Sequence, residues 1–468
     1  MIKKLLNNKL LKNGGLYLFG NLFNKAIAFL TVPIFTRLLT TAEYGIVSTY
    51  TSWVSIFTVI VGLNLGNTIR NAFVDHRDDV DGYISSIFSL SFVNFLLIFA
   101  ICFCANLGLG IIDTPLLVMC LFESFGAFIV NSLVVKYMME EEAKKRTMFL
   151  VLPNLLAAIL SVIMILLMKD HKEYGRIIPG VIVTCIFGLV IFCKYIFRNR
   201  KLIDTKYWKY ALPITIPLVF HGLSSNILST SDRTIITVFR SASETGIYSV
   251  TCSLVTVSTV ITSSIESVWI PYFTKNMLAG NHEGINRNAK IYIELCTIIF
   301  CGIIVVAPEV LVLFASSKYA SGVTVIAPIV LATYFQYLYS LAVNTEYYYK
   351  KTSIIATNTL ISAVINLVLN FIFIPQWGAL AAAFTTAASY FVSFMLHYRY
   401  CRKLNRELFP FNTFAMPLMV IVLFTIFQYV TIYHAVIRWV AGLLMILLYT
   451  VFVYIRNREV ISALVNKK

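Results

Sequence analysis

Long runs of apolar residues recur from one end of the chain to the other, separated by short polar segments. A run of about 20 apolar residues is long enough to cross the hydrocarbon core of a bilayer as a helix. The segments between the runs are too short to hold a folded domain outside the membrane. The pattern therefore predicts an all-α polytopic membrane protein with fourteen transmembrane helices, at residues 14–36, 44–69, 83–107, 114–138, 148–168, 177–197, 211–235, 245–270, 289–314, 322–346, 353–375, 378–398, 411–433 and 435–455.

The composition agrees with a membrane protein and narrows the function. Hydrophobic residues make up 59% of the chain and charged residues only 13%, whereas about a quarter of the residues in soluble proteins are charged. A soluble enzyme, a disordered protein and a nucleic-acid-binding domain are thereby excluded. The net charge of +16 follows the topology, because most lysines and arginines lie before the first predicted helix or after an even-numbered one. Since positive segments stay on the cytoplasmic side, we expect both termini in the cytoplasm and these residues in contact with membrane lipids.

The nine cysteines lie almost entirely inside the apolar runs and show no paired spacing. This pattern is typical of small packing residues, and it predicts neither a disulfide framework nor a metal site. Residues 1–13 are basic and partly apolar, but no cleavage site follows them. We therefore expect a retained N-terminal segment that lies on the cytoplasmic membrane surface as an amphipathic helix.

The chain contains an internal repeat of roughly 200 residues. Three pairs of short sequences occupy matching places relative to the predicted helices: Glu43-Tyr44-Gly45 and Glu244-Thr245-Gly246, Lys144-Lys145 and Lys350-Lys351, Tyr174-Gly175 and Trp377-Gly378. Each copy has an even number of helices, so both copies enter the membrane in the same direction. Parallel repeats are typical of transporters that handle substrate between two lobes. We expect an N-lobe at 14–200, a C-lobe at 201–406, and two added helices with a cytoplasmic tail at 407–468.

Several of these segments together resemble a known family. Residues 21–45 resemble the opening of the polysaccharide transporter family of the multidrug, oligosaccharidyl-lipid and polysaccharide exporter superfamily. Residues 212–233 with 246–249 are similar to the opening of that family's second half, and residues 370–383 to its turn between helices 11 and 12. In this last segment, alanines stand where the family often has another glycine. The resemblance covers the whole chain, and fourteen helices are the number that this family has.

The resemblance implies a flippase and not an enzyme. It implies that an oligosaccharide linked to undecaprenyl pyrophosphate moves from the cytoplasmic to the outer leaflet of a bacterial cytoplasmic membrane by alternating access. The glycan would be O antigen, capsule or a related polysaccharide. Polysaccharide polymerase and chain-length proteins would be partners, a proton or sodium ion would be the coupling ion, and no cofactor is implied.

Ionisable side chains at membrane depth are costly and therefore mark candidate sites. Lys25 lies in the middle of the first predicted helix, with Asn21 one turn earlier on the same face. Its ammonium group would meet the pyrophosphate of the lipid, or it would pair with a glutamate or extend to the interface. Glu123, on the fourth helix, is a candidate partner of Lys25 or a titrating group in ion coupling, with a purely structural pair as an equal alternative.

The seventh and eighth helices hold the remaining candidate binding residues. His221 follows two prolines that would let its helix bend, and it would either titrate near neutral pH or be satisfied by a neighbour. Glu266 lies on the eighth helix, which, like the second, is rich in serine and threonine. Such density suits the wall of a hydrated cavity, although hydroxyl groups also join helices. We therefore expect helices 1, 2, 7 and 8 to line the cavity.

Two arginines occupy equivalent places near the outer ends of helices 1 and 7. These are Arg37 and Arg233, the latter following Asp232. Arg233 is a candidate substrate-binding residue. We expect Arg37 and Asp232 to form a gate or a contact between lobes, with a simple helix-end charge as the alternative.

Other classes of function lack the sequence features that they require. The acidic segment 78–81 has the form of a metal-binding pair, but no nucleotide-binding domain surrounds it, which favours a solvated loop. No Walker A or nucleophile-elbow sequence is present, so ATP hydrolysis is unsupported. A drug or cation antiporter of the same superfamily is the first alternative, and predicts an acid-lined cavity. A membrane-bound polysaccharide polymerase is the second, and predicts a large catalytic loop.

Overall fold

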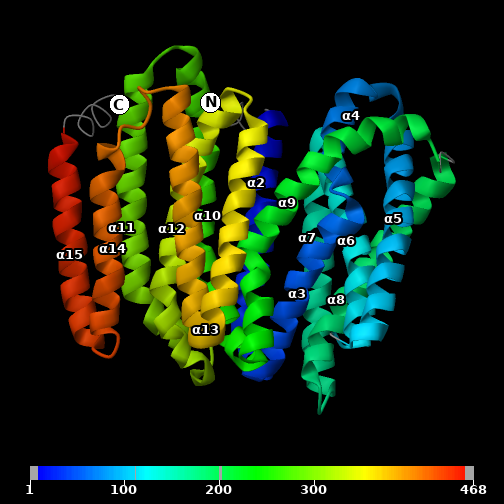
Figure 1. Ribbon diagram of the computed structural model, residues 1–468, viewed down its shortest axis with the longest axis horizontal. Coiled ribbons are helices and arrows are strands. Elements are labelled where there is room, and N and C mark those ends of the chain that lie inside the picture. Colours follow the sequence, from blue (N-terminus) through cyan, green and yellow to red (C-terminus); the bar gives the residue numbers. More distant parts are fainter. Residues whose placement is uncertain (1–8, 111, 200–202, 459–468) are drawn as a thin grey trace. The chain divides into compact units, whose positions relative to one another are not determined.

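The computed structural model describes residues 9–110, 112–199 and 203–458, and within these ranges it contains helices and no strand (Figure 1). The α-helices are α2 (Lys9–Leu38), α3 (Thr41–Gly62), α4 (Ile69–Asp75), α5 (Val80–Leu109), α6 (Thr114–Met139), α7 (Ala143–Leu167), α8 (Lys172–Asn199), α9 (Thr205–Phe239), α10 (Ala242–Leu278), α11 (His282–Phe314), α12 (Val323–Tyr348), α13 (Thr352–Leu404), α14 (Asn412–Thr431) and α15 (Ala435–Arg456). Three 3-10 helices lie between them: η1 (Leu65–Thr68), η2 (Arg77–Asp79) and η3 (Ser317–Gly322).

The predicted fold class is confirmed. Among the described residues, 12 helices are long and apolar enough to cross a membrane. The longest of them, α13, has 53 residues and contains Gly378 with φ 58° and ψ −138°. This conformation is accessible to glycine because it has no Cβ, and it divides α13 at the place where the sequence predicts a turn between two spans. The 30-residue α2 corresponds to the first predicted span.

The second predicted span is shorter than expected at its C-terminal end. Thr40 and Glu43 form a capping box at its start, where each side chain bonds the other residue's backbone N–H. Its end lies at Gly62, because Leu63 and Asn64 both adopt left-handed backbone conformations. The predicted range 44–69 therefore includes α3, this break and the 3-10 helix η1.

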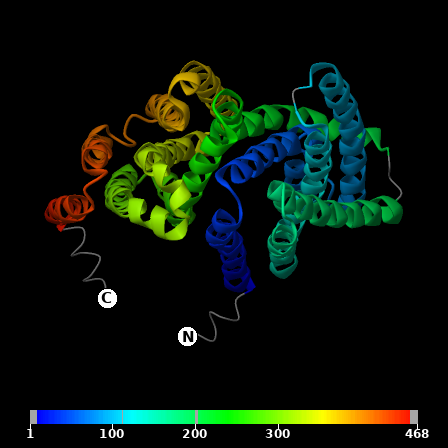
Figure 2. The same ribbon diagram turned by 90° about the horizontal axis from the view of Figure 1, so that it is seen from below.

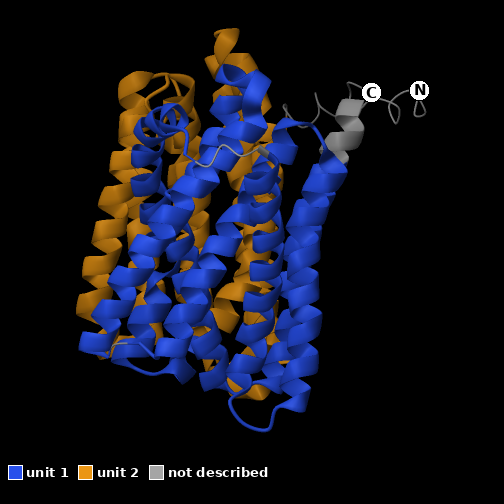
Figure 3. Ribbon diagram, turned by 90° about the vertical axis from the view of Figure 1, so that its right-hand side faces the viewer, with its two compact units in different colours: residues 1–246 blue, residues 247–468 orange. Residues whose placement is uncertain are grey.

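The chain divides into two compact units, residues 1–246 and 247–468 (Figure 3). In unit 1, α8 packs against α6 and α7, α3 packs against α6 and α9, and α2 packs against α7 (Figure 2). A large cluster of buried apolar residues in this unit includes Ile84, Phe88, Ile129 and Leu133 of α5 and α6. This cluster fixes the helices that surround the site described below. The lobes expected at 14–200 and 201–406 remain a prediction from the repeat.

The first turns of α3 and α10 approach each other within unit 1. A Cβ on Gly45 would lie 1.7 Å from the carbonyl oxygen of Ala242, and a Cβ on Gly246 would lie 2.0 Å from that of Thr41. The hydroxyl groups of Thr41 and Ser243 share a hydrogen bond of 2.7 Å at the same crossing. The glycines of the two repeat copies therefore permit a close backbone contact that a side chain would prevent.

Two ion pairs connect α15 to α11 in unit 2. Arg438, at the start of α15, pairs with Glu309, and Arg456, at its end, lies 3.6 Å from Glu294. Asn457 also donates a 2.7 Å hydrogen bond to Glu294. Because the pairs lie near both ends of α15, the helix is fixed in register along its whole length.

The predicted segments at the two ends of the chain are described only in part. Residues 1–8 of the expected amphipathic segment 1–13 lie outside the described residues, and from Lys9 onward the chain belongs to α2. Residues 459–468 of the expected cytoplasmic tail also lie outside the described residues.

Candidate functional site

A polar cavity of about 280 Å³ lies inside unit 1, between α2, α3, α6, α7 and α8. Alanines and other small residues from α2 and α7 leave room for it. Polar side chains on all five helices line it: Asn24, Thr31, Tyr50, Thr51, Glu123, Asn154, Arg176 and Thr184. Because polar groups at membrane depth are costly unless they serve a site or find partners, this cavity is the candidate site of the unit.

Glu123 is the acidic group of the cavity. It lies on α6, and its Oε2 accepts a hydrogen bond of 2.6 Å from the hydroxyl group of Tyr50 on α3. On the α8 side it faces Gly180, where a Cβ would lie 3.4 Å from Oε1. The carboxyl group is thus held between three helices.

Arg176 supplies the positive charge. It lies near the start of α8, and its Nη1 donates a 3.0 Å hydrogen bond to the hydroxyl group of Ser161 on α7. Its guanidinium carbon lies 4.4 Å from the centre of the Phe35 ring on α2, at cation–π distance. It also interacts electrostatically with Glu123. Among its described lining residues, the cavity therefore contains one acidic and one basic side chain, whose formal charges are equal and opposite.

Amide side chains join α2 to α7 beside this charged pair. Asn154 donates a hydrogen bond of 2.9 Å to the side-chain oxygen of Asn24. Three residues earlier on α2 and eight residues earlier on α7, Arg146 donates a bond of 3.1 Å to the side-chain oxygen of Asn21. Lys25 is half-buried and follows Asn24 directly on α2. Asn21 therefore lies at the α2–α7 contact, whereas Lys25 adjoins the lining residue Asn24 in the chain and is not itself among the described lining residues.

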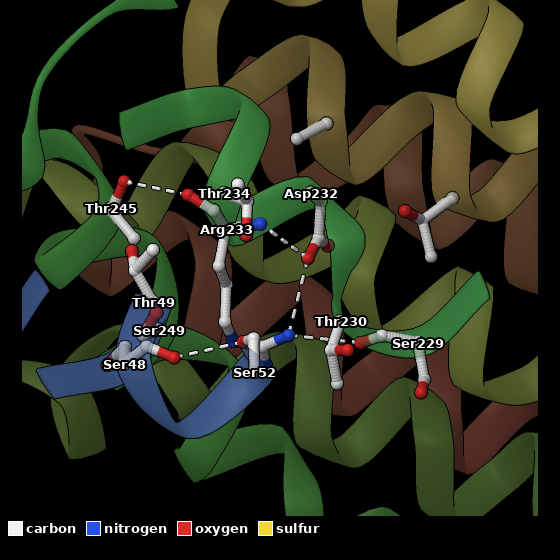
Figure 4. Close-up of polar contacts among 12 residues, drawn as sticks. Ser48, Thr49, Ser52, Ser229, Thr230, Asp232, Arg233, Thr234, Thr245 and Ser249 are labelled. Carbon is white, nitrogen blue, oxygen red and sulfur yellow. Dashed lines mark hydrogen bonds and ion pairs between the residues drawn. The ribbon is translucent and has the colours of Figure 1, made fainter. Parts of the chain in front are cut away.

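The predicted pair on α9 lies in a second polar region of unit 1 (Figure 4). Asp232 is 3% exposed, and its Oδ1 lies 3.3 Å from Nη1 of Arg233, which also donates to the Ser229 carbonyl at 3.0 Å. Trp53 of α3 donates a 3.0 Å hydrogen bond to the hydroxyl group of Thr234. The Asp232–Arg233 pair thus lies beside the α3–α9 contact.

Arg37 makes the same local contact as its repeat counterpart. Its Nη1 donates a 2.9 Å hydrogen bond to the carbonyl group of Pro33, four residues earlier, as Arg233 does to Ser229. Both arginines thereby satisfy part of their hydrogen-bonding capacity within their own helix.

The remaining predicted residues lie away from the cavity. His221 lies on α9, next to the segment where Asn64, between α3 and η1, donates to the carbonyl group of Leu218 at 2.8 Å. Glu266 lies on α10 in unit 2, where it interacts electrostatically with Tyr337 of α12. Of the eight residues proposed from the sequence, Glu123 is the one among the described lining residues of the cavity.

Tyr50, Asn154 and Arg176 are among the cavity residues that sequence analysis missed. Arg176 immediately precedes the predicted span 177–197, whereas α8 begins at Lys172 and includes it. A signal was present, because Arg176, Gly180 and Thr184 recur every four residues and therefore share one helix face. Tyr50 and Asn154 carry no comparable signal.

The helical architecture, with 12 described helices long and apolar enough to cross a membrane, defines a multi-span membrane protein. A family model described as polysaccharide biosynthesis protein matches residues 10–277, which is more than half of the chain. The protein belongs to this polysaccharide biosynthesis family, which confirms the resemblance found in the sequence.

Curated relatives agree with the family match. The chain is 23% identical over 418 residues to the capsular polysaccharide biosynthesis protein CapF of Staphylococcus aureus, covering 84% of this chain and 100% of the relative. It is also 24% identical over 232 residues to a Haloferax volcanii protein named "Probable low-salt glycan biosynthesis flippase Agl15", covering 48% of each chain.

A solved structure of similar fold is the lipid II flippase MurJ in an inward closed conformation. The TM-score is 0.74, and the match covers 95% of this chain and 99% of MurJ. At 14% sequence identity, this likeness concerns the fold.

Proposed function

We propose that this protein is a flippase that moves an oligosaccharide linked to undecaprenyl pyrophosphate from the cytoplasmic to the outer leaflet of a bacterial cytoplasmic membrane. The observation that carries the proposal is the charge-balanced polar cavity of unit 1, in a chain of the polysaccharide biosynthesis family. A glycan carrier needs both an anion-binding group and hydrogen-bonding groups for sugar hydroxyls, and this cavity has both.

Arg176 suits the pyrophosphate of such a lipid. A guanidinium group binds phosphate oxygens through two parallel hydrogen bonds, and Arg176 is already oriented by Ser161 and Phe35. Lys25, half-buried beside the cavity lining, would add a second cation. The two groups together match the charge of a pyrophosphate better than either does alone.

The amide groups suit the sugar. Asn24 and Asn154 bond each other at the cavity wall, and each offers both a donor and an acceptor to a sugar hydroxyl. The cavity volume of about 280 Å³ is near the lower limit of sites for drug-sized ligands, about 300 Å³. It would therefore hold one sugar ring or the pyrophosphate, and not a whole oligosaccharide.

The charge balance also distinguishes the flippase from a drug or cation antiporter. A site for an organic cation requires an excess of negative charge, because the buried cation must be neutralised. Here Arg176 offsets Glu123 within the same cavity. An anionic lipid that engages Arg176 would instead free Glu123 to accept a proton, which links the cavity to the proposed coupling ion.

The test uses proteoliposomes that contain a fluorescent lipid-pyrophosphate oligosaccharide, and it measures how much becomes accessible to an impermeant modifying enzyme. We expect protein-dependent movement, which Lys25→Ala and Arg176→Gln each reduce at least tenfold. The matched controls are Lys209→Ala and Arg70→Gln, which remove exposed charges on α9 and α4 and should leave movement unchanged.

Two results would contradict the proposal. Full movement by both cavity variants, at normal insertion, would show that the cavity does not bind the lipid. Absence of glycan movement together with proton-linked efflux of an organic cation would identify an antiporter.

A further inference from the structure

Each unit has a basic pocket at the end of its sixth repeat helix. In unit 1 the pocket has a volume of about 200 Å³ and is lined by Lys194 and Arg198 of α8 with Lys145 of α7. In unit 2 the pocket has a volume of about 590 Å³ and is lined by Arg399 and Lys403 at the end of α13. Both pockets lie at helix ends that the charge distribution predicts to be cytoplasmic.

The two pockets are built from the same sequence pattern. A cation followed by tyrosine and, three residues later, by a second cation occurs as Lys194-Tyr195-Ile-Phe-Arg198 and again as Arg399-Tyr400-Cys-Arg-Lys403. The two cations of each pattern are one turn apart on the same helix face. Like charges in this arrangement repel and destabilise a helix by a few tenths of a kcal/mol, so their presence in both copies favours an anion that lies between them.

Protein groups do not neutralise these cations. In unit 1 two acids also line the pocket, but both pair with a further lining residue, because Lys136 lies 2.5 Å from Asp81 and 3.3 Å from Glu140. Among the described residues, Lys194 and Arg198 form no ion pair. The pocket of unit 1 therefore keeps an uncompensated positive charge.

The pocket of unit 2 is more basic. Arg402 donates a 2.8 Å hydrogen bond to the carbonyl group of Leu408, which fixes one side of the pocket. Lys403 lies 5.9 Å from the centre of the Tyr400 ring. Within the described part of the chain, no acidic residue lines this pocket.

An exposed apolar stripe continues from each pattern along its helix. In α8, Ile186 and Val190 precede Lys194 at four-residue spacing and are 55% and 63% exposed. In α13, Phe391 and Met395 precede Arg399 in the same way and are 38% and 37% exposed. A cation above an apolar stripe on one helix face matches a phospholipid, with its phosphate at the cation and its acyl chain along the stripe. A free phosphate ion would gain nothing from the stripe.

We propose that each unit binds one anionic phospholipid, with its phosphate held by Lys194 and Arg198 in unit 1 and by Arg399 and Lys403 in unit 2. The cytoplasmic leaflet is the anionic one, and basic pockets between membrane helices on this side bind such headgroups. The sites are separate from the Glu123 cavity and do not depend on the proposed transport activity.

Native mass spectrometry of the purified full-length protein tests the proposal, with phosphatidylglycerol as the probe and phosphatidylcholine as the uncharged reference. We expect two retained phosphatidylglycerol molecules in the unaltered protein, one in Lys194→Gln/Arg198→Gln, one in Arg399→Gln/Lys403→Gln, and none in the combined variant. Loss of two cations should weaken each site roughly 30-fold.

Controls separate charge at these positions from general effects. The variant Lys194→Arg/Arg198→Lys keeps both charges and should retain the lipid. Lys144→Gln/Lys206→Gln removes two exposed lysines that line neither pocket and should also retain it. Equal retention by the unaltered protein and the combined variant would overturn the proposal.

Two competition experiments identify the source of the phosphate. Displacement of phosphatidylglycerol by inorganic phosphate at equal concentration would overturn the assignment to a lipid. If the variants abolished binding of undecaprenyl pyrophosphate and left phosphatidylglycerol binding unchanged, the assignment to a phospholipid would be overturned. The pockets would then belong to the path of the transported lipid. If neither inorganic phosphate nor undecaprenyl pyrophosphate displaced phosphatidylglycerol, the assignment to an anionic phospholipid would be supported.

Discussion

The contact between Gly45 and Gly246 allows a sharp test of how the two repeat copies meet. In Gly45→Ala the new Cβ would lie 1.7 Å from the carbonyl oxygen of Ala242 and 2.6 Å from its carbonyl carbon. The shortest comfortable distance between such a carbon and an oxygen is about 3.3 Å, so the backbones must separate by about 1.5 Å. Both atoms belong to the backbone and have no side-chain rotamer through which to move away.

The magnitude follows from two opposing effects. Added methyl groups in a well-packed site usually cost about 1–3 kcal/mol, and a backbone clash belongs at the upper end of that range. Alanine in place of glycine in a helix recovers at most about 1 kcal/mol. We therefore expect Gly45→Ala to lower the free energy of unfolding by about 2 kcal/mol.

Gly302 provides the matched control. It lies inside α11, and a Cβ there would meet no atom within 4 Å. Gly302→Ala should thus be neutral or stabilising, because it keeps the helical gain without the clash. The measurement is denaturing-detergent unfolding of the purified protein, followed by tryptophan fluorescence.

The outcome of the double variant completes the test. Gly45→Ala and Gly246→Ala each force the same two helices apart, and the separation that accommodates one methyl group also makes room for the other. The loss of unfolding free energy in the double variant should therefore be less than the sum of the two single losses. Equal stability of Gly45→Ala and Gly302→Ala would refute the close backbone approach.

Three further predictions concern single side chains. Tyr50→Phe removes the 2.6 Å hydrogen bond to Glu123 and should reduce glycan movement in the proteoliposome assay, with unchanged expression as the control. Arg438→Met leaves Glu309 without its ion-pair partner. It should destabilise the protein by about 1–2 kcal/mol, less than for a fully buried pair because the Glu309 side chain is 37% exposed; a smaller loss in the double variant with Glu309→Gln would identify the pair as the cause. Asn370→Ala removes a fully buried amide that bonds across the two halves of α13 and should cost about 1–3 kcal/mol in the same unfolding assay.

The spans were predictable because bilayer thickness imposes a length on apolar runs. The division of α13 at Gly378 was also predictable. The repeat aligns Trp377-Gly378 with Tyr174-Gly175, which lies near the start of α8, so a new helix is expected to start near Gly378. The end of α3 was not predictable, because the apolar Leu63, and not the glycine before it, adopts the left-handed backbone conformation at the break. Local backbone conformation of this kind depends on partners such as the α9 carbonyl group that accepts from Asn64.

The candidate cavity was less predictable than the spans, for a reason seen in α3. Its hydroxyl-rich sequence suggested a hydrated wall, yet Thr51, Ser52 and Ser55 each donate to the carbonyl group four residues earlier. A hydroxyl group that bonds its own helix lies comfortably in a membrane without any cavity. The density of serine and threonine therefore measures how many polar groups a helix carries, and not how many remain available.

Charged and amide groups are more informative, because a helix cannot satisfy them alone. A carboxylate such as Glu123 has no hydrogen to donate to its own backbone carbonyl groups, and the backbone N–H groups of a helix interior are already used. Its partners Tyr50 and Arg176 therefore lie on other helices. Where these long side chains meet, space remains between the helices. Among polar residues at membrane depth, an acid and an arginine on different helices therefore predict a cavity better than a row of hydroxyl groups does.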